Sequence, residues 1–299
     1  MTTQQAAGKR HVIVGAGPAG LRAIETIRSH ESGSSITLIG DEQAYSRMVL
    51  PYLLAGDIEE KGVLTGDSSY FSSLNVETRF GRKVTSIDSR ANTVTLDDGS
   101  TVSYDDLLIS TGSLATRPQI PGADLPGVQN MWTLEDARSF LSRAKPNSEV
   151  VIVGAGFIGL IILNGLHSAK HKITFVELED HILPRMIDAG GAAVVEGWMG
   201  RHGVESITGA TVTERSSSNG RFTLRLKDGR TLGADSVVMA TGIKPNMDFA
   251  GSAGIKTREG ILVNNKLQTS VSNIYAAGDV AEGPVLGSNA QEVHAIQPT

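Results

Sequence analysis

The chain has 299 residues, of which 40% are hydrophobic and 20% charged, which is ordinary composition for a globular protein with room for two domains. The 27 Lys and Arg residues against 32 Asp and Glu residues give a formal net charge of −5, so no nucleic-acid-binding surface is expected. There is no cysteine, which excludes disulfides, thiolate metal sites, iron–sulfur clusters and redox-active thiols within this chain.

The first ten residues are polar and run into an apolar segment without the hydrophobic region of a signal peptide. The longest uncharged apolar run, 150–166, is shorter than the ~20 residues of a spanning helix and contains four glycines. We therefore expect a cytoplasmic protein that does not associate with a membrane.

In chain order, the first half opens with a β-branched strand at Arg10–Val14, a glycine-rich loop and a segment of helical length. A second strand is expected at Ser35–Ile39. The Asp97-Asp98-Gly99 sequence lies between two alternating segments and predicts a hairpin turn. An apolar strand then runs into Thr111-Gly112.

The second half repeats this design. Residues 12–21 return as residues 151–160, and residues 96–112 align without gaps to residues 226–242 with seven of 17 positions identical. Strands are expected at Glu149–Val153 and Lys172–Val176, and a second hairpin turn at 227–229. The repeat predicts two units of like construction.

Pro- and Gly-rich joints at 117–122 and 242–246 predict the domain boundaries. Residues 1–118 form the first part of one domain, residues 119–242 form a second domain, and residues 243–299 return to the first. We expect an α/β fold of two Rossmann-like three-layer dinucleotide-binding domains, the second inserted into the first.

Each glycine loop has the G-x-G-x-x-G pattern between an expected strand and an expected helix. The first glycine permits the turn, the second admits a pyrophosphate, and the third allows the helix to pack on the strand. Glu177 follows Gly154 by 23 residues, at the distance of an acid that binds a ribose diol. The acids around it, Glu179 and Asp180, favour NADH over NADPH by repelling a 2′-phosphate. In the first half, Asp41 or Glu42 would take the ribose role.

The segment Asn273–Val280 is an apolar strand that ends in Gly278-Asp279. By its chemistry alone, Asp279 is as well explained as a helix cap as it is as a ligand-binding residue. The histidines show no spacing typical of a metal site, so no metal ligand is expected.

The sequence resembles the FAD-dependent pyridine nucleotide–disulfide oxidoreductase family. Within it, the chain is most similar to the branch without an active disulfide, which contains ferredoxin and rubredoxin reductases and the FAD-containing module of nitrite reductases. The motifs that carry the resemblance cover the whole chain: 15–20 (GAGPAG), 44–47 (AYSR), 108–112 (LISTG), 154–159 (GAGFIG), 240–246 (ATGIKPN) and 275–279 (YAAGD).

The resemblance implies two cofactor sites and no catalytic side chain. The FAD site would comprise Gly15, Gly17, Pro18, Ala19, Gly20, Asp41, Glu42, Arg47, Val84, Thr111, Gly112, Gly278 and Asp279. The NAD(H) site would comprise Gly154, Gly156, Phe157, Ile158, Gly159, Glu177 and Gly242. Arg47 would lie along the flavin side, Asp279 would bind the ribityl chain, and the following helix would face the flavin pyrimidine edge. His294 is a further candidate neighbour of the flavin.

The implied reaction is hydride transfer from NADH to FAD. Because cysteine is absent, the electrons would then pass to an external acceptor, a protein such as a ferredoxin or rubredoxin or a partner redox subunit. Two alternatives stay open: an electron-relay subunit without its own turnover, and an NADH oxidase that reduces oxygen.

The chain departs from the family pattern in two respects. A Lys and a Glu that ferredoxin-reductase relatives usually carry are replaced by Tyr52 and Ile161, so the nicotinamide pocket is expected to differ. The sequence stops before the C-terminal interface domain of the family, and two explanations stay open: a truncated chain, or a subunit whose missing part a partner replaces. In either case we expect association with another chain, as a homo- or hetero-oligomer, or low stability of the chain alone.

Overall fold

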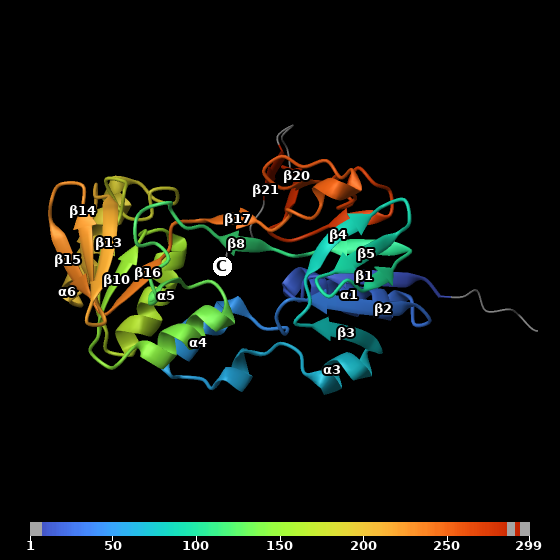
Figure 1. Cartoon of the computed structure of the whole chain (residues 1–299), viewed down its shortest axis with the longest axis horizontal. Helices are drawn as coiled ribbons and strands as arrows, with labels where there is room; N and C mark the ends of the chain where they lie inside the picture. Colours follow the sequence, from blue (N-terminus) through green and yellow to red (C-terminus); the bar gives the residue numbers. More distant parts are fainter. Residues whose placement is uncertain (1–7, 286–290, 294–299) are drawn as a thin grey trace, which may run out of the picture. The chain divides into compact units, whose positions relative to one another are not determined.

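The computed structural model describes residues 8–285 and 291–293, and the chain divides into two compact units (Figure 1). The first unit comprises Met1–Ser46, Leu64–Leu114 and Lys244–Thr299. The second comprises Arg47–Val63 and Ala115–Ile243. His294 lies outside the described residues. No helix of the described part is long and apolar enough to cross a membrane.

The first unit is built on a five-stranded parallel sheet with the order β19-β7-β1-β2-β3. The small strands β4, β5 and β6 form an antiparallel sheet, and β18, β20 and β21 form a mixed sheet. Its elements are β1 (Arg10–Val14), α1 (Pro18–His30), β2 (Ser35–Gly40), α3 (Ser68–Ser73), β3 (Val76–Phe80), β4 (Val84–Asp88), β5 (Thr93–Leu96), β6 (Thr101–Ser103), β7 (Asp106–Ile109), η3 (Gly251–Ala253), β18 (Ile261–Leu262), β19 (Ile274–Ala276), β20 (Ala281–Pro284) and β21 (Gln291–Val293).

Both faces of this parallel sheet are covered, which is why its strands β1 and β2 are buried without alternation. On one face, Ile24 of α1 and Phe71 of α3 pack against Ile13, Ile36 and Leu38. On the other face, side chains of β4, β5 and β6 pack against β1 and β7 in a second core cluster. The unit is therefore a three-layer structure of helices, parallel sheet and antiparallel sheet.

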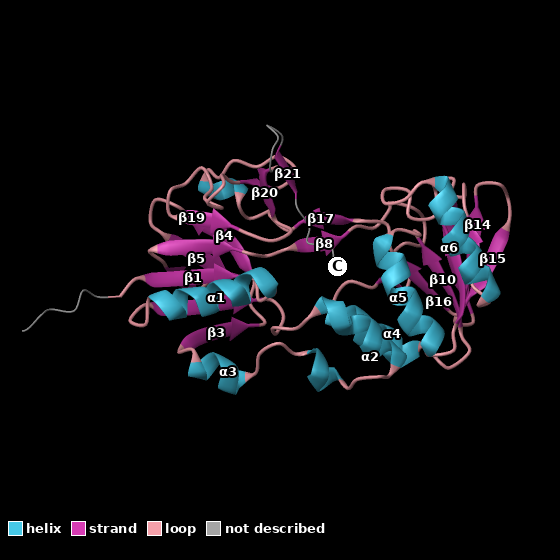
Figure 2. Cartoon of the chain, turned by 180° about the vertical axis from the view of Figure 1, so that it is seen from behind, coloured by secondary structure: helices cyan, strands magenta, loops and turns pink. Residues whose placement is uncertain are grey.

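The second unit repeats this plan with a parallel sheet in the order β12-β11-β10-β16-β9 and an antiparallel sheet in the order β13-β14-β15. In Figure 2, α1 lies in front of the strands of the first unit and α6 in front of the strands of the second. The elements of the second unit are η1 (Arg47–Val49), α2 (Leu50–Ala55), η2 (Glu60–Val63), β9 (Val128–Asn130), α4 (Leu134–Arg143), β10 (Glu149–Val153), α5 (Phe157–Ser168), β11 (Lys172–Val176), α6 (Ala189–Arg201), β12 (Glu205–Ile207), β13 (Val212–Ser218), β14 (Arg221–Leu226), β15 (Thr231–Ala234) and β16 (Ser236–Met239).

The α/β fold of two Rossmann-like three-layer units is confirmed, and both predicted hairpin turns join antiparallel strands, β5 to β6 and β14 to β15. The chain passes between the units within β8 (Ser113–Ala115) and β17 (Ile243–Pro245). Segment 47–63, which lies inside the first part of the predicted FAD domain, packs with the second unit.

The helix expected after Asp279 does not begin within residues 280–285. Residues 281–284 instead form β20, which pairs with β18 in parallel and with β21 in antiparallel orientation. Glu282 explains this conformation, because its side chain is 1% exposed and accepts hydrogen bonds from the Glu259 and Gly260 amides. A buried carboxylate with these partners holds the segment extended against the loop before β18.

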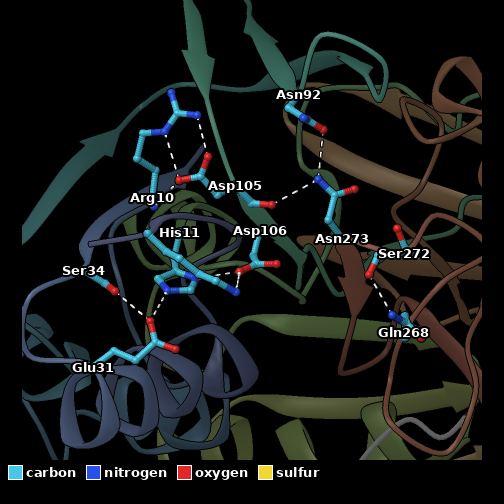
Figure 3. A network of polar contacts seen from close by, with 11 residues as sticks. Arg10, His11, Glu31, Ser34, Asn92, Asp105, Asp106, Gln268, Ser272 and Asn273 are labelled. Carbon is cyan, nitrogen blue, oxygen red and sulfur yellow. Dashed lines mark hydrogen bonds and ion pairs between the residues drawn. The ribbon is translucent and has the colours of Figure 1, made fainter. Parts of the chain in front are cut away.

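Polar contacts join the amino-terminal ends of β1 and β7 to the loop that follows α1 (Figure 3). The Arg10 guanidinium donates two hydrogen bonds to Asp105, and this contact lowers the pKa of Asp105 to about 2. His11 lies 2.9 Å from the Glu31 carboxylate and 3.7 Å from Asp106. This network lies at the amino-terminal ends of the strands, and the glycine loop follows the carboxyl end of β1.

Helix α2 packs closely on α5 within the second unit. A Cβ atom at Gly165 would lie 2.3 Å from the Pro51 carbonyl oxygen, well inside van der Waals contact. Glycine at this position therefore permits the backbones of the two helices to touch.

We expect Gly165→Ala to lower the free energy of unfolding by about 1–3 kcal/mol, because the added methyl group must push α2 away from α5. Urea unfolding would measure the change. The matched control is Gly200→Ala in α6, where a Cβ has nothing within 4 Å and helix propensity favours alanine. Equal destabilisation in both variants would contradict the packing argument.

Candidate functional site

The two glycine loops lie at equivalent points of the two parallel sheets. Strand β1 has β2 on one side and β7 on the other, and β10 has β11 and β16 in the same arrangement. The strand order reverses at β1 and at β10, and ligands of open α/β sheets bind at the carboxyl ends of strands beside such a point. Each loop leaves the carboxyl end of the central strand and enters a helix.

The first glycine of each loop is required by its contacts. Gly15 has φ +108° and its Cβ would lie 2.2 Å from the Ser110 carbonyl oxygen, while Gly154 has φ +102° and its Cβ would lie 2.3 Å from the Ala240 carbonyl oxygen. Both the positive φ and the close carbonyl exclude any side chain.

The second and third glycines differ in what surrounds them. A Cβ at Gly20 or Gly159 would collide with the carbonyl of the first glycine, at 2.1 Å and 2.5 Å. At Gly17 and Gly156 a Cβ would meet nothing within 4 Å, although both residues have extended backbone that tolerates any side chain. Open space at an N-cap without a side-chain cap is the geometry that receives a phosphate.

Segments far apart in the sequence surround the loop of the first unit. Gly278 has φ +80°, and its Cβ would lie 3.4 Å from the Cβ of Ala19. The Ser113 hydroxyl donates a 2.8 Å hydrogen bond to Asp279 Oδ2. Thr111 donates to the Asn246 carbonyl at 2.7 Å. The structure thus brings the predicted residues 15–20, 111–112 and 278–279 to one edge of the sheet.

In the second unit, Glu177 follows β11 directly and is 7% exposed. The Ala155 amide in the glycine loop donates to Glu177 Oε2 at 2.6 Å, and the Glu179 amide donates to Oε1 at 3.0 Å. The carboxylate is therefore held against the glycine loop at the carboxyl end of β11.

The equivalent position of the first unit is a glycine. Val14 pairs with Ile39, and Val153 pairs with Val176, so the residue that corresponds to Glu177 is Gly40. A Cβ at Gly40 would lie 2.9 Å from the Glu42 carbonyl oxygen. The next residue, Asp41, is exposed, and Glu42 accepts a hydrogen bond from the Tyr45 hydroxyl.

The remaining candidates lie in several places. Gly242 follows β16 and accepts a hydrogen bond from the Thr116 amide. Val84 lies on β4 and packs against the core of the first unit. Arg47 belongs to the second unit, where its guanidinium lies 4.9 Å from the ring centre of Trp132. Pro18, Phe157 and Ile158 occupy the first turns of α1 and α5.

Two serines at the first site were not predicted from the sequence. The Ser110 hydroxyl lies 3.0 Å from the carbonyl oxygens of Val14 and Gly15, and so ties β7 to the glycine loop. Ser113 is 1% exposed and orients Asp279. Both flank the Thr111-Gly112 motif, and this position is the sequence feature that could have identified them.

Comparison with known proteins places this architecture in a family. The model of the pyridine nucleotide-disulphide oxidoreductase family matches residues 9–293. The chain belongs to this family, and the resemblance inferred from its motifs is confirmed.

Individual relatives extend beyond the length of this chain. It is 31% identical over 270 residues to the NADH-dependent phenylglyoxylate dehydrogenase subunit epsilon of Aromatoleum evansii, covering 90% of this chain and 64% of the relative. It is 32% identical to nitrite reductase [NAD(P)H] of Bacillus subtilis (strain 168), covering 92% and 34%. The putidaredoxin reductase–putidaredoxin complex matches at a TM-score of 0.91 and 26% identity, covering 97% and 72%. The chain thus spans between one third and three quarters of these relatives.

We expect Glu177→Ala to lower the free energy of unfolding of the second unit by about 1–3 kcal/mol, because it leaves the Ala155 and Glu179 amides without their acceptor. Glu177→Gln keeps one acceptor oxygen and should cost less. Thermal unfolding monitored by circular dichroism would measure both. Glu179→Ala, which removes an exposed side chain beside it, is the control and should be neutral.

Proposed function

We propose that the chain is an FAD flavoprotein oxidoreductase that takes electrons from NADH and passes them to a separate electron-carrier protein. The observation that carries this proposal is the presence of two glycine loops that leave the same open space at their second glycine. Each loop lies where the strand order of its own sheet reverses. Two such loops suit two dinucleotides. FAD supplies the capacity to accept hydride from NADH and release electrons one at a time.

The first unit suits FAD. Gly17 leaves room for the pyrophosphate beside the α1 N-terminus, and Ala19 and Gly20 complete the cradle. Asp279 is half-buried and has its Oδ2 atom fixed by Ser113, which leaves Oδ1 for a hydroxyl of the ribityl chain. Thr111, Gly112 and Gly278 line the same edge, and Asp41 or Glu42 remains the ribose acid.

The second unit suits NADH. Gly156 opens the pyrophosphate position at the α5 N-terminus, where Phe157 supplies an amide that Pro18 lacks in α1. Glu177 faces the ribose position, and the exposed Glu179 and Asp180 follow it. This acidic run repels a 2′-phosphate, and the unit should therefore prefer NADH to NADPH.

An external acceptor follows from the composition. The chain has no cysteine, so the electrons cannot pass to a redox-active thiol within it. The putidaredoxin reductase relative was crystallised with putidaredoxin, a protein partner. We propose that this chain likewise serves a protein acceptor. Its cytoplasmic location and its association into an oligomer stay predictions.

Two side chains bear on whether this chain oxidises NADH itself or only relays electrons. Tyr52 on α2 is 52% exposed, and Ile161 lies on α5, the helix against which α2 packs. The two replace an expected charged pair with uncharged groups, which removes the cost of burying one charge without the other. We propose that NADH oxidation survives this exchange.

Anaerobic absorption spectra with and without NADH test the proposal directly. The purified chain should show a flavin band that NADH bleaches rapidly, and NADPH should bleach it more slowly. A flavin band that persists under excess NADH would contradict turnover and favour the relay subunit. Peroxide formation under air would indicate the oxidase alternative.

Gly17→Ala and Gly156→Ala provide matched variants of this experiment. Neither added methyl group meets protein atoms, so both variants should fold with unchanged stability. Gly17→Ala should weaken FAD retention by roughly 10–100-fold, while Gly156→Ala should retain FAD and weaken NADH binding to a similar degree, because each methyl group displaces a charged phosphate from its donors. The reverse assignment, or equal loss in both, would contradict the proposed division of cofactors.

Asp279→Ala should lower FAD affinity by about tenfold, because it removes a charged acceptor. Ser113→Ala should have a smaller effect, since it frees the carboxylate without removing it. Asp98→Ala, at an exposed turn of the same unit, is the control. Fluorescence titration of the apoprotein with FAD would measure all three, and unchanged affinity in Asp279→Ala would remove this residue from the site.

A further inference from the structure

A buried arginine in the second unit has no partner among the described residues. Arg215 on β13 is 2% exposed, and its Nε, Nη1 and Nη2 atoms are all buried without a hydrogen bond. A guanidinium carries its positive charge at any physiological pH and offers five N–H donors. Burying it without a counter-charge or acceptor is strongly unfavourable, so this side chain requires an acceptor that the described residues do not provide.

The internal repeat shows which residue occupies the equivalent position of the first unit. Val84 pairs with Leu96 and Val212 pairs with Leu226, and a register irregularity follows in both hairpins. Counting from that point, Ile87 corresponds to Arg215, since they pair with Val94 and Leu224. Ile87 is 2% exposed in the core of the first unit. The equivalent position of the same three-layer plan thus holds an aliphatic side chain in one unit and a cation in the other.

The loop of residues 116–127 covers β13 beside Arg215. The Arg215 amide donates to the Pro121 carbonyl at 3.0 Å, and a Cβ at Gly122 would lie 2.0 Å from the Arg215 carbonyl oxygen. Gly122 has φ +80°, so both contact and conformation require glycine here. The loop backbone therefore contacts the residue that carries the unpaired guanidinium.

The loop also carries an arginine, Arg117, whose charge acts on Arg215. Burial and the nearby positive charge of Arg117 lower the pKa of Arg215, while Asp124 opposes this shift. The Asp124 carboxylate is 96% exposed and lies 3.7 Å from Arg117, which is beyond hydrogen-bond length. Arg117 therefore has one solvated carboxylate near it, and the Arg215 guanidinium has no acceptor within hydrogen-bond distance among the described residues.

We propose that Arg215 and Arg117 form a binding site for a small phosphate-type oxoanion beneath the 116–127 loop. Planar guanidinium groups bind tetrahedral oxoanions through paired N–H donors, and one anion between the two arginines would neutralise both. Because Arg215 is covered, binding requires the loop to open, and the bound anion then holds the loop on β13. This site is separate from the glycine loops and does not rest on the proposed function.

Thermal unfolding of the full chain in phosphate and in chloride at equal ionic strength tests the site. Inorganic phosphate should raise the Tm by roughly 3 °C or more at saturation, because a ligand that binds only the folded state stabilises it. Arg215→Ile, which copies Ile87, should lose most of the phosphate-dependent shift, keeping only what the glycine loops and the general stabilising effect of phosphate contribute. It should have an equal or higher Tm in chloride. Arg215→Met provides a second variant should the branched side chain not fit.

Two controls separate this site from others that bind phosphate. Gly156→Ala should keep the shift, because its effect is confined to the glycine loop. Arg225→Ala should also keep it, since Arg225 is 60% exposed on the adjacent strand and pairs with Glu214. A shift of equal size in Arg215→Ile, no shift in the unmodified chain, or loss of the shift in Gly156→Ala would each overturn the proposal.

The source of the phosphate group is distinguished by the probe. Inorganic phosphate and phenyl phosphate are compared at equal concentration, and hydrogen exchange of the amides in the 116–127 loop is followed in each. Protection by both indicates a phosphorylated ligand, and protection by inorganic phosphate alone indicates the free ion. Protection by neither would overturn the site.

Discussion

The structure of each unit depends on one steric constraint, the contact between the first glycine of the loop and the carbonyl of the neighbouring strand. Gly15 meets the Ser110 carbonyl and Gly154 meets the Ala240 carbonyl at nearly the same separation. This contact brings the loop down between the carboxyl ends of two strands. The helix that follows therefore begins beside the switch point, and its unpaired amides face the place where a pyrophosphate would lie.

Much of this was predictable because backbone requirements leave direct traces in sequence. A positive φ beside a carbonyl demands glycine, so the two loops, the hairpin turns and the Gly278-Asp279 strand end could all be located. Positions that depend on side-chain packing left weaker traces. The extended form of residues 281–284 follows from the burial of Glu282, which a short apolar run cannot reveal. The acids predicted for the first half, Asp41 and Glu42, come after Gly40, which takes the register position of Glu177.

Segment 47–63 shows a second limit of sequence-based division. It lies between β2 and α3 in the chain, yet α2 packs on α5 because Gly165 removes the side chain that would separate them. The Arg138 guanidinium also donates to Glu60 of this segment. A single glycine in the second half therefore allows a helix from the first half to pack against α5. Changes of composition along the chain do not indicate such a contact.

The repeat makes differences between the units more informative than their similarities. Where both halves need the same backbone, they keep the same residues. Where they diverge, one half has acquired a property that the common fold does not require, as with Glu177 against Gly40 and Arg215 against Ile87. The acid at the first of these positions, Glu177, accepts a hydrogen bond from the glycine loop. A cation at the second is unfavourable for folding alone, because burial desolvates it, and its retention is best explained by an anion that the fold itself does not provide.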